Sequence, residues 1–291
     1  MPEAFIPIAL SLLAAFFFAL GAQFQNQGLP YMDSRTGATI TISTAALIYI
    51  LAAPFFLNVN NLFHPAVLIF ILVGVFRPAL SGNLALAGMR FLGPTIATTL
   101  TATSPLFGTA LGIFWLGEAL NWLAGIGTII VVAAIMLLAK KDDKKSLNWP
   151  IWALALPIGA AIIRAFGHVL TKVGMESIPD VYLASFVGLL VSAFITLSLH
   201  KFRKNAPQIL WLSKGTHWFM GASVCFSLAV IFLNIALYRG TVVQVVPIVA
   251  ASPIFTLILS LAIFRREQIT IRTLVAVCLV VPAVILIAVE G

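Results

Sequence analysis

The sequence consists mainly of long runs of apolar residues separated by short polar segments. About ten runs reach the length of a spanning helix, which needs about 20 apolar residues. Their approximate limits are 5–27, 35–57, 66–89, 94–115, 121–139, 150–174, 180–199, 216–238, 242–264 and 270–289. The connections are about 16 residues long at most, so they leave no room for a second soluble domain. The pattern therefore predicts an all-α integral membrane protein with ten transmembrane helices.

The second half of the chain repeats features of the first half. The motif SPLF at 104–107 returns as SPIF at 252–255. The flanking residues that correspond are Arg90 with Arg239, Glu118 with Glu267, Gly21 with Gly167, and Gly28 with Gly174. This ordered match predicts two repeats of five helices, 1–145 and 146–291. Because each repeat has an odd number of spans, the repeats are inverted in the membrane, an architecture common among transporters.

Two segments resemble the EamA-type members of the drug/metabolite transporter superfamily: GPTIATTLTATSPLFGTALGIFWLGEAL (93–120) and GTVVQVVPIVAASPIFTLILSLAIFRREQI (240–269). Each has a helix of small residues, a proline at its middle and a following Gly-Glu or Arg-Glu turn. The resemblance covers nearly the whole chain. It implies alternating access by rocking of two four-helix bundles, with peripheral fifth helices that support a homodimer or a scaffold. It says little about the substrate, because the family moves amino acids, nucleotide precursors, sugars, phosphates and drugs.

Composition excludes the soluble classes of protein. Of the 291 residues, 61% are hydrophobic and 9% are charged, whereas about 25% are charged in a soluble domain. A soluble enzyme, a nucleic-acid-binding domain or a disordered protein could not have so few charges. The net charge of +8 therefore indicates basic loops beside a lipid bilayer and no nucleic-acid partner.

The basic residues predict an orientation in the membrane. The loops after the odd-numbered helices hold about thirteen lysines and arginines, whereas the opposite loops hold Lys172 and Arg239. The positive-inside rule places the odd-numbered loops in the cytoplasm and both termini outside, in a bacterial-type cytoplasmic (inner) membrane. The family resemblance usually implies cytoplasmic termini. We follow the charge count, because the bias is large and lies in short loops.

Two arginines, Arg77 and Arg164, lie near the centres of the third and sixth predicted helices. An arginine at the bilayer centre costs roughly 2.5–3.5 kcal/mol on insertion scales, and all nine acidic residues fall at segment ends or in loops. A water-filled cavity that receives a carboxylate or phosphate would satisfy both arginines, because guanidinium groups bind these anions bidentately. The alternative is a broken helix whose carbonyls bind the arginine, since Pro78 frees a carbonyl one turn earlier.

Other polar residues at membrane depth are candidates for the same cavity. His168 follows Arg164 by one helical turn, so it could relay a proton, bind substrate or simply pack as a neutral histidine. The amide candidates for substrate binding are Gln23, Asn83, Asn234 and Gln244. A buried amide is equally often a hydrogen bond between helices, so both interpretations stay open for these residues.

The repeat predicts an aromatic wall opposite the charged one. Phe18 and Phe226 occupy the positions equivalent to Arg164 and Arg77. A cavity between the repeats would then be basic on one side and aromatic on the other.

The repeat also places prolines and glutamates at equivalent positions. Pro105 and Pro253 lie in the middle of the fourth and ninth predicted helices, where each removes a hydrogen bond and permits a hinge or a static kink. Glu118 and Glu267 are expected at the N-termini of the fifth and tenth helices, where the helix dipole favours negative charge.

Motifs that are missing from the sequence narrow the function. There is no GxxxxGK[ST] phosphate loop, HExxH, GxSxG or metal-ligand spacing, so we expect no cofactor, no metal and no direct use of ATP. We expect a secondary transporter, not an enzyme, for a small organic anion or zwitterion bearing carboxylate or phosphate. One alternative is an amino-acid or neutral-metabolite exporter of the same family. Alternatives of another class are a lipid flippase and a membrane-embedded enzyme, for which His168 is the sole catalytic candidate.

Overall fold

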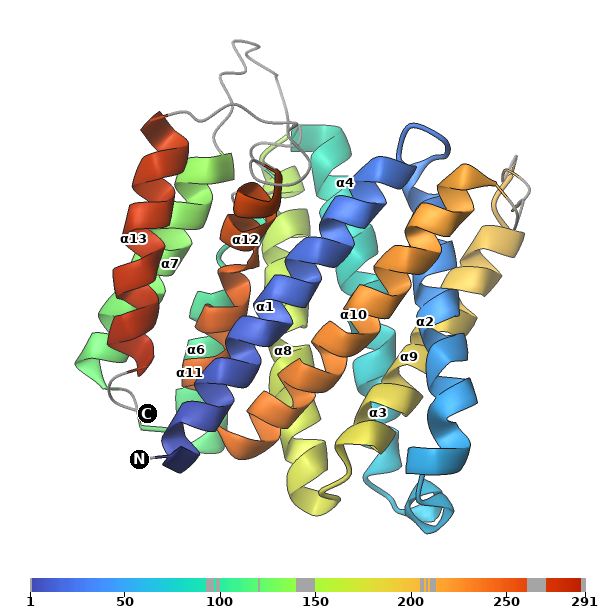
Figure 1. The fold of residues 1–291 in the computed structure, drawn as a ribbon, viewed down its shortest axis with the longest axis horizontal. Helices are drawn as coiled ribbons and strands as arrows, with labels where there is room; N and C mark the ends of the chain where they lie inside the picture. The colour runs from blue at the N-terminus through green and yellow to red at the C-terminus, as the bar shows by residue number, and fades with distance from the viewer. Residues whose placement is uncertain are drawn as a thin grey trace.

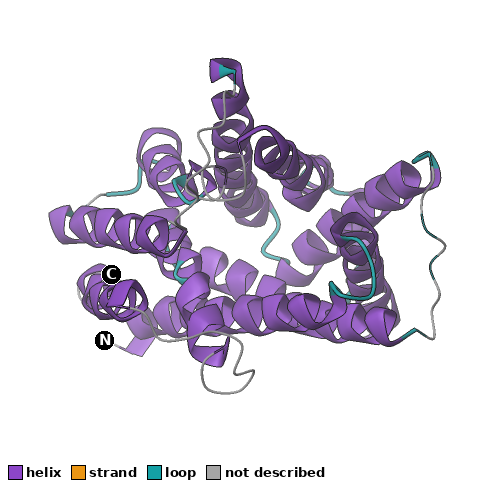
Figure 2. Cartoon of the chain, turned by 90° about the horizontal axis from the view of Figure 1, so that it is seen from above, coloured by secondary structure: helices purple, strands orange, loops and turns teal. Residues whose placement is uncertain are grey.

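The computed structural model describes residues 2–92, 97, 100–119, 121–139, 150–204, 207, 209, 213–260 and 271–288. In these residues the chain forms helices joined by short loops (Figure 2). The elements of the first predicted repeat are α1 (Pro2–Gly28), α2 (Ser34–Phe56), η1 (Val59–Phe63), α3 (Val67–Gly74), η2 (Val75–Leu80), α4 (Ser81–Leu92), α6 (Ser104–Leu116) and α7 (Trp122–Ala139). Those of the second are η3 (Ile151–Leu154), α8 (Ala155–Ser177), α9 (Val181–Lys201), α10 (Lys214–Arg239), α11 (Val242–Ala250), α12 (Ser252–Leu259) and α13 (Ile271–Ala288).

Seven helical stretches are long and apolar enough to cross a membrane. They are Phe5–Gly28, Ser34–Phe56, Val67–Ala85, Ile151–Ser177, Val181–Lys201, Lys214–Arg239 and Val242–Leu259. Three shorter apolar helices, Ser104–Leu116, Trp122–Leu137 and Cys278–Ile287, lie within the remaining predicted segments. The chain is therefore a multi-pass, all-helical membrane protein.

The helices fall into two groups, each drawn from four of the predicted segments (Figure 1), and the groups also pack closely against each other through α2 with α9 and through α6 with α11. The α1 group contains α1, α2, α10, α11 and α12, in which α1 lies along α10. The α8 group contains α3, η2, α4, α6, α8 and α9, in which α8 contacts each of the others. The remaining pair, α7 and α13, packs together at one edge of the molecule. Both groups combine helices from the two halves of the sequence, so neither group forms from one half alone.

Three segments predicted as single helices are interrupted. The third is broken at Arg77, and new helices begin at Ser104 in the fourth segment and at Ser252 in the ninth. Pro105 and Pro253 therefore lie in the first turn of α6 and α12, not at mid-helix as the sequence suggested. A proline is well accommodated there, because the N–H that it lacks has no partner within the helix. Their role as hinges stays a prediction.

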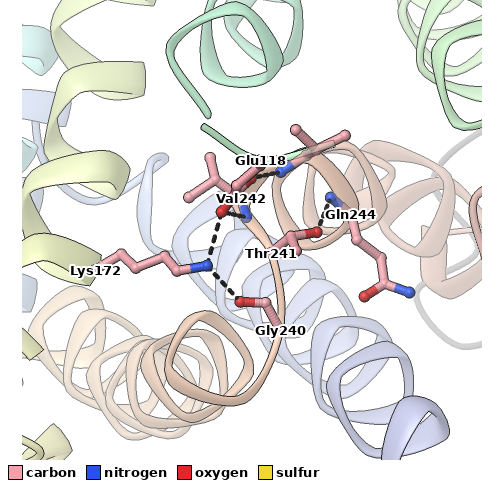
Figure 3. Close-up of polar contacts among 7 residues, drawn as sticks. Glu118, Lys172, Gly240, Thr241, Val242 and Gln244 are labelled. Carbon is pink, nitrogen blue, oxygen red and sulfur yellow. Dashed lines mark hydrogen bonds and ion pairs between the residues drawn. The ribbon is translucent and has the colours of Figure 1, made fainter. Parts of the chain in front are cut away.

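At the end of the molecule where α1 begins and α13 ends, Glu118 joins the two groups (Figures 1 and 3). Its carboxylate accepts hydrogen bonds from the N–H groups of Val242 at 2.8 Å and Val243 at 2.9 Å. Lys172 of α8 donates to Glu118 Oε1 at 2.7 Å and to the carbonyl of Gly240 at 2.8 Å. The Glu118 side chain is only 6% exposed. This well-shielded cluster therefore caps α11 of the α1 group with a residue of the α8 group.

The expected position of Glu118 was wrong in one respect. It caps a helix N-terminus, but that helix is α11 rather than α7, which follows Glu118 in sequence. The cause is the left-handed conformation of Gly117, with φ of 67°, which ends α6 and turns the chain. Gly112 leaves the space, since a Cβ there would lie 2.7 Å from Glu118 Oε2. The second predicted residue of this kind, Glu267, lies outside the described residues.

A second ion pair joins the groups at the opposite end. Asp33, between α1 and α2, accepts a hydrogen bond from Arg203 Nη1 at 2.8 Å, just after α9. Asp33 also caps α2 and accepts from the Thr36 hydroxyl at 2.6 Å. Partial burial raises the pKa of Asp33, but the hydrogen bonds from Thr36 and Arg203 outweigh this effect and lower the pKa to about 2 from its ordinary 3.8. The carboxylate is therefore stabilised in the folded state.

We predict that Glu118→Ala lowers the free energy of unfolding by about 3 kcal/mol, because it leaves the Lys172 ammonium and two N–H groups of α11 without their acceptor. Glu118→Gln keeps one acceptor oxygen and should cost less. Thermal or denaturant unfolding of the purified protein in detergent measures both changes. The matched control is Glu176→Ala, at an exposed glutamate of α8, which should change stability by less than about 0.5 kcal/mol. Equal effects of the two alanine variants would contradict the prediction.

Asp33→Asn should lower stability by about 1 kcal/mol at pH 6, a modest value because the pair is about one-third exposed and screened by solvent. The folded-state pKa lies below the unfolded value, so the carboxylate stabilises the fold fully above about pH 4 and loses this effect as the pH falls towards 2. The difference between the parent protein and the variant should therefore shrink over this range in unfolding experiments. Arg203→Gln should reproduce the loss at pH 6, and the double variant should add little.

Candidate functional site

The third segment opens at Arg77, in the middle of the molecule. The residue before a proline is disfavoured in the helical region, and Arg77, which precedes Pro78, is extended with φ −131° and ψ 130°. The opening leaves backbone carbonyls without helical partners. The Ser192 hydroxyl of α9 lies 2.5 Å from the Gly74 carbonyl and 2.7 Å from the Arg77 carbonyl. Ser192 therefore satisfies the broken backbone from a neighbouring helix.

This repair requires α3 and α9 to lie very close together. A Cβ on Gly74 would lie 2.6 Å from the Gly188 carbonyl oxygen and 2.7 Å from Val191 Cβ. No real Cβ tolerates such contacts, so glycine at position 74 permits the approach that brings Ser192 to the break.

The Arg77 side chain extends from the break to α8. It passes over Gly167, where an added Cβ would lie 2.9 Å from Arg77 Cγ. Its Nη1 atom lies 2.6 Å from His168 Nδ1, and His168 is only 7% exposed. A guanidinium group has donors and no acceptor, so His168 accepts through an unprotonated Nδ1. The imidazole is therefore neutral, and its remaining proton is on Nε2.

Arg164 lies one helical turn before His168 on α8, so both project from the same face. Its side chain is exposed, although α8 packs against α3, α4, α6 and α10. Arg77 reaches α8 beside Arg164 through its contact with His168. The structure therefore brings the three predicted residues to one place.

The arginines have no acidic partner in the part of the chain that the structure describes. The acidic side chains described there lie at helix ends, and they are Asp33, Glu118, Glu176 and Asp180. The carbonyls freed at the break accept from Ser192 rather than from the guanidinium group of Arg77. The alternative interpretation from the sequence, in which those carbonyls satisfy the arginine, is therefore not the arrangement that forms.

The predicted amides do not gather around the arginines. Gln23 Nε2 donates to the Thr256 carbonyl of α12 at 2.7 Å, and Asn234 Nδ2 donates to Ser185 Oγ of α9 at 2.8 Å. These two amides therefore join helices. Asn83 Nδ2 donates at 2.8 Å to the carbonyl of Ala79, one turn earlier in its own segment.

Gln244 differs from the other amides. Its backbone N–H donates to Thr241 Oγ1 at 3.2 Å in the cap of α11. Its side chain extends away from Glu118 (Figure 3), and the buried Nε2 atom has no hydrogen-bond partner among the described residues. Gln244 is therefore the predicted amide with a free donor.

The predicted aromatic residues contact each other. The rings of Phe18 and Phe226 have centroids 5.9 Å apart and are inclined by 46°. Phe226 also lies over Gly21, where a Cβ would be 3.1 Å from the ring. Both rings are half-buried, and together they join α1 to α10.

Sequence reasoning missed the roles of three residues. Ser192 and Gly167 position Arg77, and Lys172 pairs with Glu118 at the end of the molecule. Gly188 and Ser192 are small residues four positions apart in an apolar helix, a pattern typical of close helix packing in membranes. That signal could have identified α9 as the partner of the break. Nothing local in the sequence indicates that Gly167 makes room for Arg77 or that Lys172 pairs with Glu118.

We predict that Ser192→Ala lowers the free energy of unfolding by about 1–3 kcal/mol, because it leaves buried carbonyls without a donor. It should also lower the affinity for any ligand that binds at Arg77, because the position of the Arg77 side chain depends on the break. Unfolding and ligand-binding measurements on the purified protein test the two effects. Thr196→Val is the control, since the Thr196 hydroxyl of the same helix bonds the Ser192 carbonyl of its own preceding turn. If both variants behave alike, the repair by Ser192 is unimportant.

Comparisons with known proteins concern the family and the fold. A family model described as the EamA-like transporter family matches the chain twice, at residues 5–140 and 151–289. Among the curated proteins, no sequence matches this chain. One crystal structure, described only as that of a protein, has a similar fold. The similarity covers 98% of this chain and 96% of the matched chain, with a TM-score of 0.78 and 16% sequence identity. At that level of identity the similarity shows a shared fold and nothing further.

Proposed function

The chain belongs to the EamA-like transporter family, and on that premise we propose that it moves a small organic anion or zwitterion across a membrane as a secondary transporter. The family resemblance inferred from the Ser-Pro segments is thereby confirmed. The family's members are transporters, which agrees with the expectation that the protein is not an enzyme. The substrate class is our own proposal, and it rests on the site at Arg77, His168 and Arg164.

The proposal rests on the observation that two arginines lie close together in the interior. No acidic side chain among the described residues lies beside them. Each would cost roughly 2.5–3.5 kcal/mol at the bilayer centre unless it faced water or a partner. Arg164 is accessible and Arg77 is partly so, so a carboxylate or phosphate can reach them. Binding sites beside interrupted helices near the membrane midplane are common among secondary transporters.

The way the two groups are joined supports a mechanism of alternating access. The α1 group and the α8 group meet at Glu118 at one end and at Asp33 at the other. We propose that each contact parts when its end of the molecule opens. The Glu118 cluster is more buried than the Asp33 pair. The side chains of Glu118 and Lys172 are 6% and 14% exposed, whereas those of Asp33 and Arg203 are 34% and 30% exposed. This difference supports a conformation that is closed at the end where the termini lie.

The topology in the membrane is part of the same proposal. The ten predicted segments, divided at residues 1–145 and 146–291, form two inverted five-helix repeats. The charge count places the termini and Glu118 outside and Asp33 on the cytoplasmic side of a bacterial-type inner membrane. We propose that the α7–α13 pair, which packs at the molecular edge, supports a homodimer.

Ligand-induced stabilisation tests the substrate class. We expect small organic anions, but not cations or neutral metabolites, to raise the unfolding temperature of the purified protein. A ligand at one hundred times its Kd stabilises the folded state by about 2.7 kcal/mol. Arg77→Ala and Arg164→Ala should abolish this effect, whereas Lys201→Ala, which removes a positive charge at the exposed end of α9, should keep it.

The same experiment can contradict the proposal. If neutral or cationic compounds stabilise the protein and the Arg77 and Arg164 variants respond like the parent, the arginines are structural. The anion site would then be wrong, while membership of the transporter family would stand.

A further inference from the structure

The site at Arg77 and Arg164 carries more charge than one carboxylate can neutralise. Building on the proposed function, we infer that its substrate is a soluble dianion, a phosphate monoester or a dicarboxylate, and not a monoanion or an amino-acid zwitterion. This narrows the substrate class by charge, which the family membership leaves open.

The first step is to count the charges at the site before a substrate binds. Arg77 and Arg164 each carry one positive charge, and both lie beside His168, Arg77 through its hydrogen bond and Arg164 one helical turn away on α8. His168 adds no positive charge, because its Nδ1 atom accepts a hydrogen bond from Arg77 Nη1 at 2.6 Å and is therefore unprotonated. The acidic side chains described in the structure lie at helix ends. Two positive charges therefore meet at this point without compensation from the described residues.

The second step compares the possible occupants. A monoanion leaves one positive charge uncompensated in a region of low dielectric constant, where such a charge is costly. A zwitterion leaves both charges and brings its own ammonium group near two guanidinium groups, which repel it. A dianion makes the occupied site neutral. The charge balance therefore selects against the first two classes.

The third step concerns hydrogen-bond donors. A guanidinium group has five N–H donors in a planar arrangement, and Arg77 uses one of them on His168. The other N–H groups of both arginines and the Nε2–H of His168 are all donors, so they cannot satisfy one another. Phosphate and carboxylate oxygens accept from such groups bidentately. The set therefore matches an occupant rich in acceptor oxygens.

Matched pairs of compounds test the inference, because each pair differs by one charge and hardly at all in shape. The first pair is succinate and monomethyl succinate, and the second is phenyl phosphate and methyl phenyl phosphate. Binding to the full chain in nanodiscs at pH 8 is measured by calorimetry or thermal shift. We expect the dianion of at least one pair to bind at least tenfold more tightly than its monoanionic ester.

The variants use the ratio of the two affinities as the readout. Arg164→Gln and Arg77→Gln should each reduce the dianion preference to about one. Lys201→Gln, which removes a positive charge at the exposed end of α9, should leave the ratio unchanged. Both compounds of a pair are measured on the same variant, so a general loss of stability does not alter the ratio. A variant with less stable folding therefore still tests the inference.

The outcomes separate this inference from the proposed function. Equal binding of dianion and monoester, with loss of both in the arginine variants, would overturn the inference and leave the anion site intact. Tighter binding of a zwitterion such as alanine than of succinate would overturn it in the same way. Binding of neutral compounds alone would overturn both proposals. An effect of phosphatidic acid in the nanodisc without any effect of the soluble dianions would show that the phosphate belongs to a lipid, contrary to the inference.

Discussion

The structure depends on one constraint, which is that a backbone polar group inside a membrane must be satisfied by the protein itself. The break at Arg77 would be prohibitive in lipid, and it forms because the Ser192 hydroxyl reaches the carbonyls of Gly74 and Arg77. That contact in turn requires the close approach of α3 and α9 at Gly74. The break releases Arg77 from helical geometry, so that its side chain crosses Gly167 and reaches His168. The central site is therefore a product of helix packing around a defect.

The two groups share an apolar core as well as polar contacts. The buried cluster around Phe70 of α3 and Leu233 of α10 combines residues of both groups and contains no charged side chain among its described members. The buried hydrogen bond from Asn234 of α10 to Ser185 of α9 also crosses between the groups. The ion pairs described between the groups lie at the two ends, at Glu118 and at Asp33. Polar contacts near the membrane surfaces can exchange partners with water when they separate. This distribution suits a protein whose groups must part at one end while they remain together at the other.

The sequence was sufficient for the helical membrane class and the family, but not for the site. Apolar runs of about 20 residues and the repeated Ser-Pro motif are local signals, and they predicted the helical membrane class and the family. Arg77, His168 and Arg164 could be selected because charged and titratable groups are costly at membrane depth. The partners of Gln23, Asn234 and Glu118 could not be predicted, because each lies on a segment distant in sequence. For an amide or a carboxylate, the choice between a ligand and a neighbouring helix is decided by packing.

The capping of α11 by Glu118 has a consequence for the order in which the protein is made. A ribosome synthesises Glu118 before Lys172, and Lys172 before Val242 and Val243. Until the chain has grown past position 243, the carboxylate has neither its cation nor the N–H groups that it accepts from in the finished protein. It must remain hydrated at the membrane surface during that interval. The contact that caps α11 therefore forms only after the ninth predicted segment has been made.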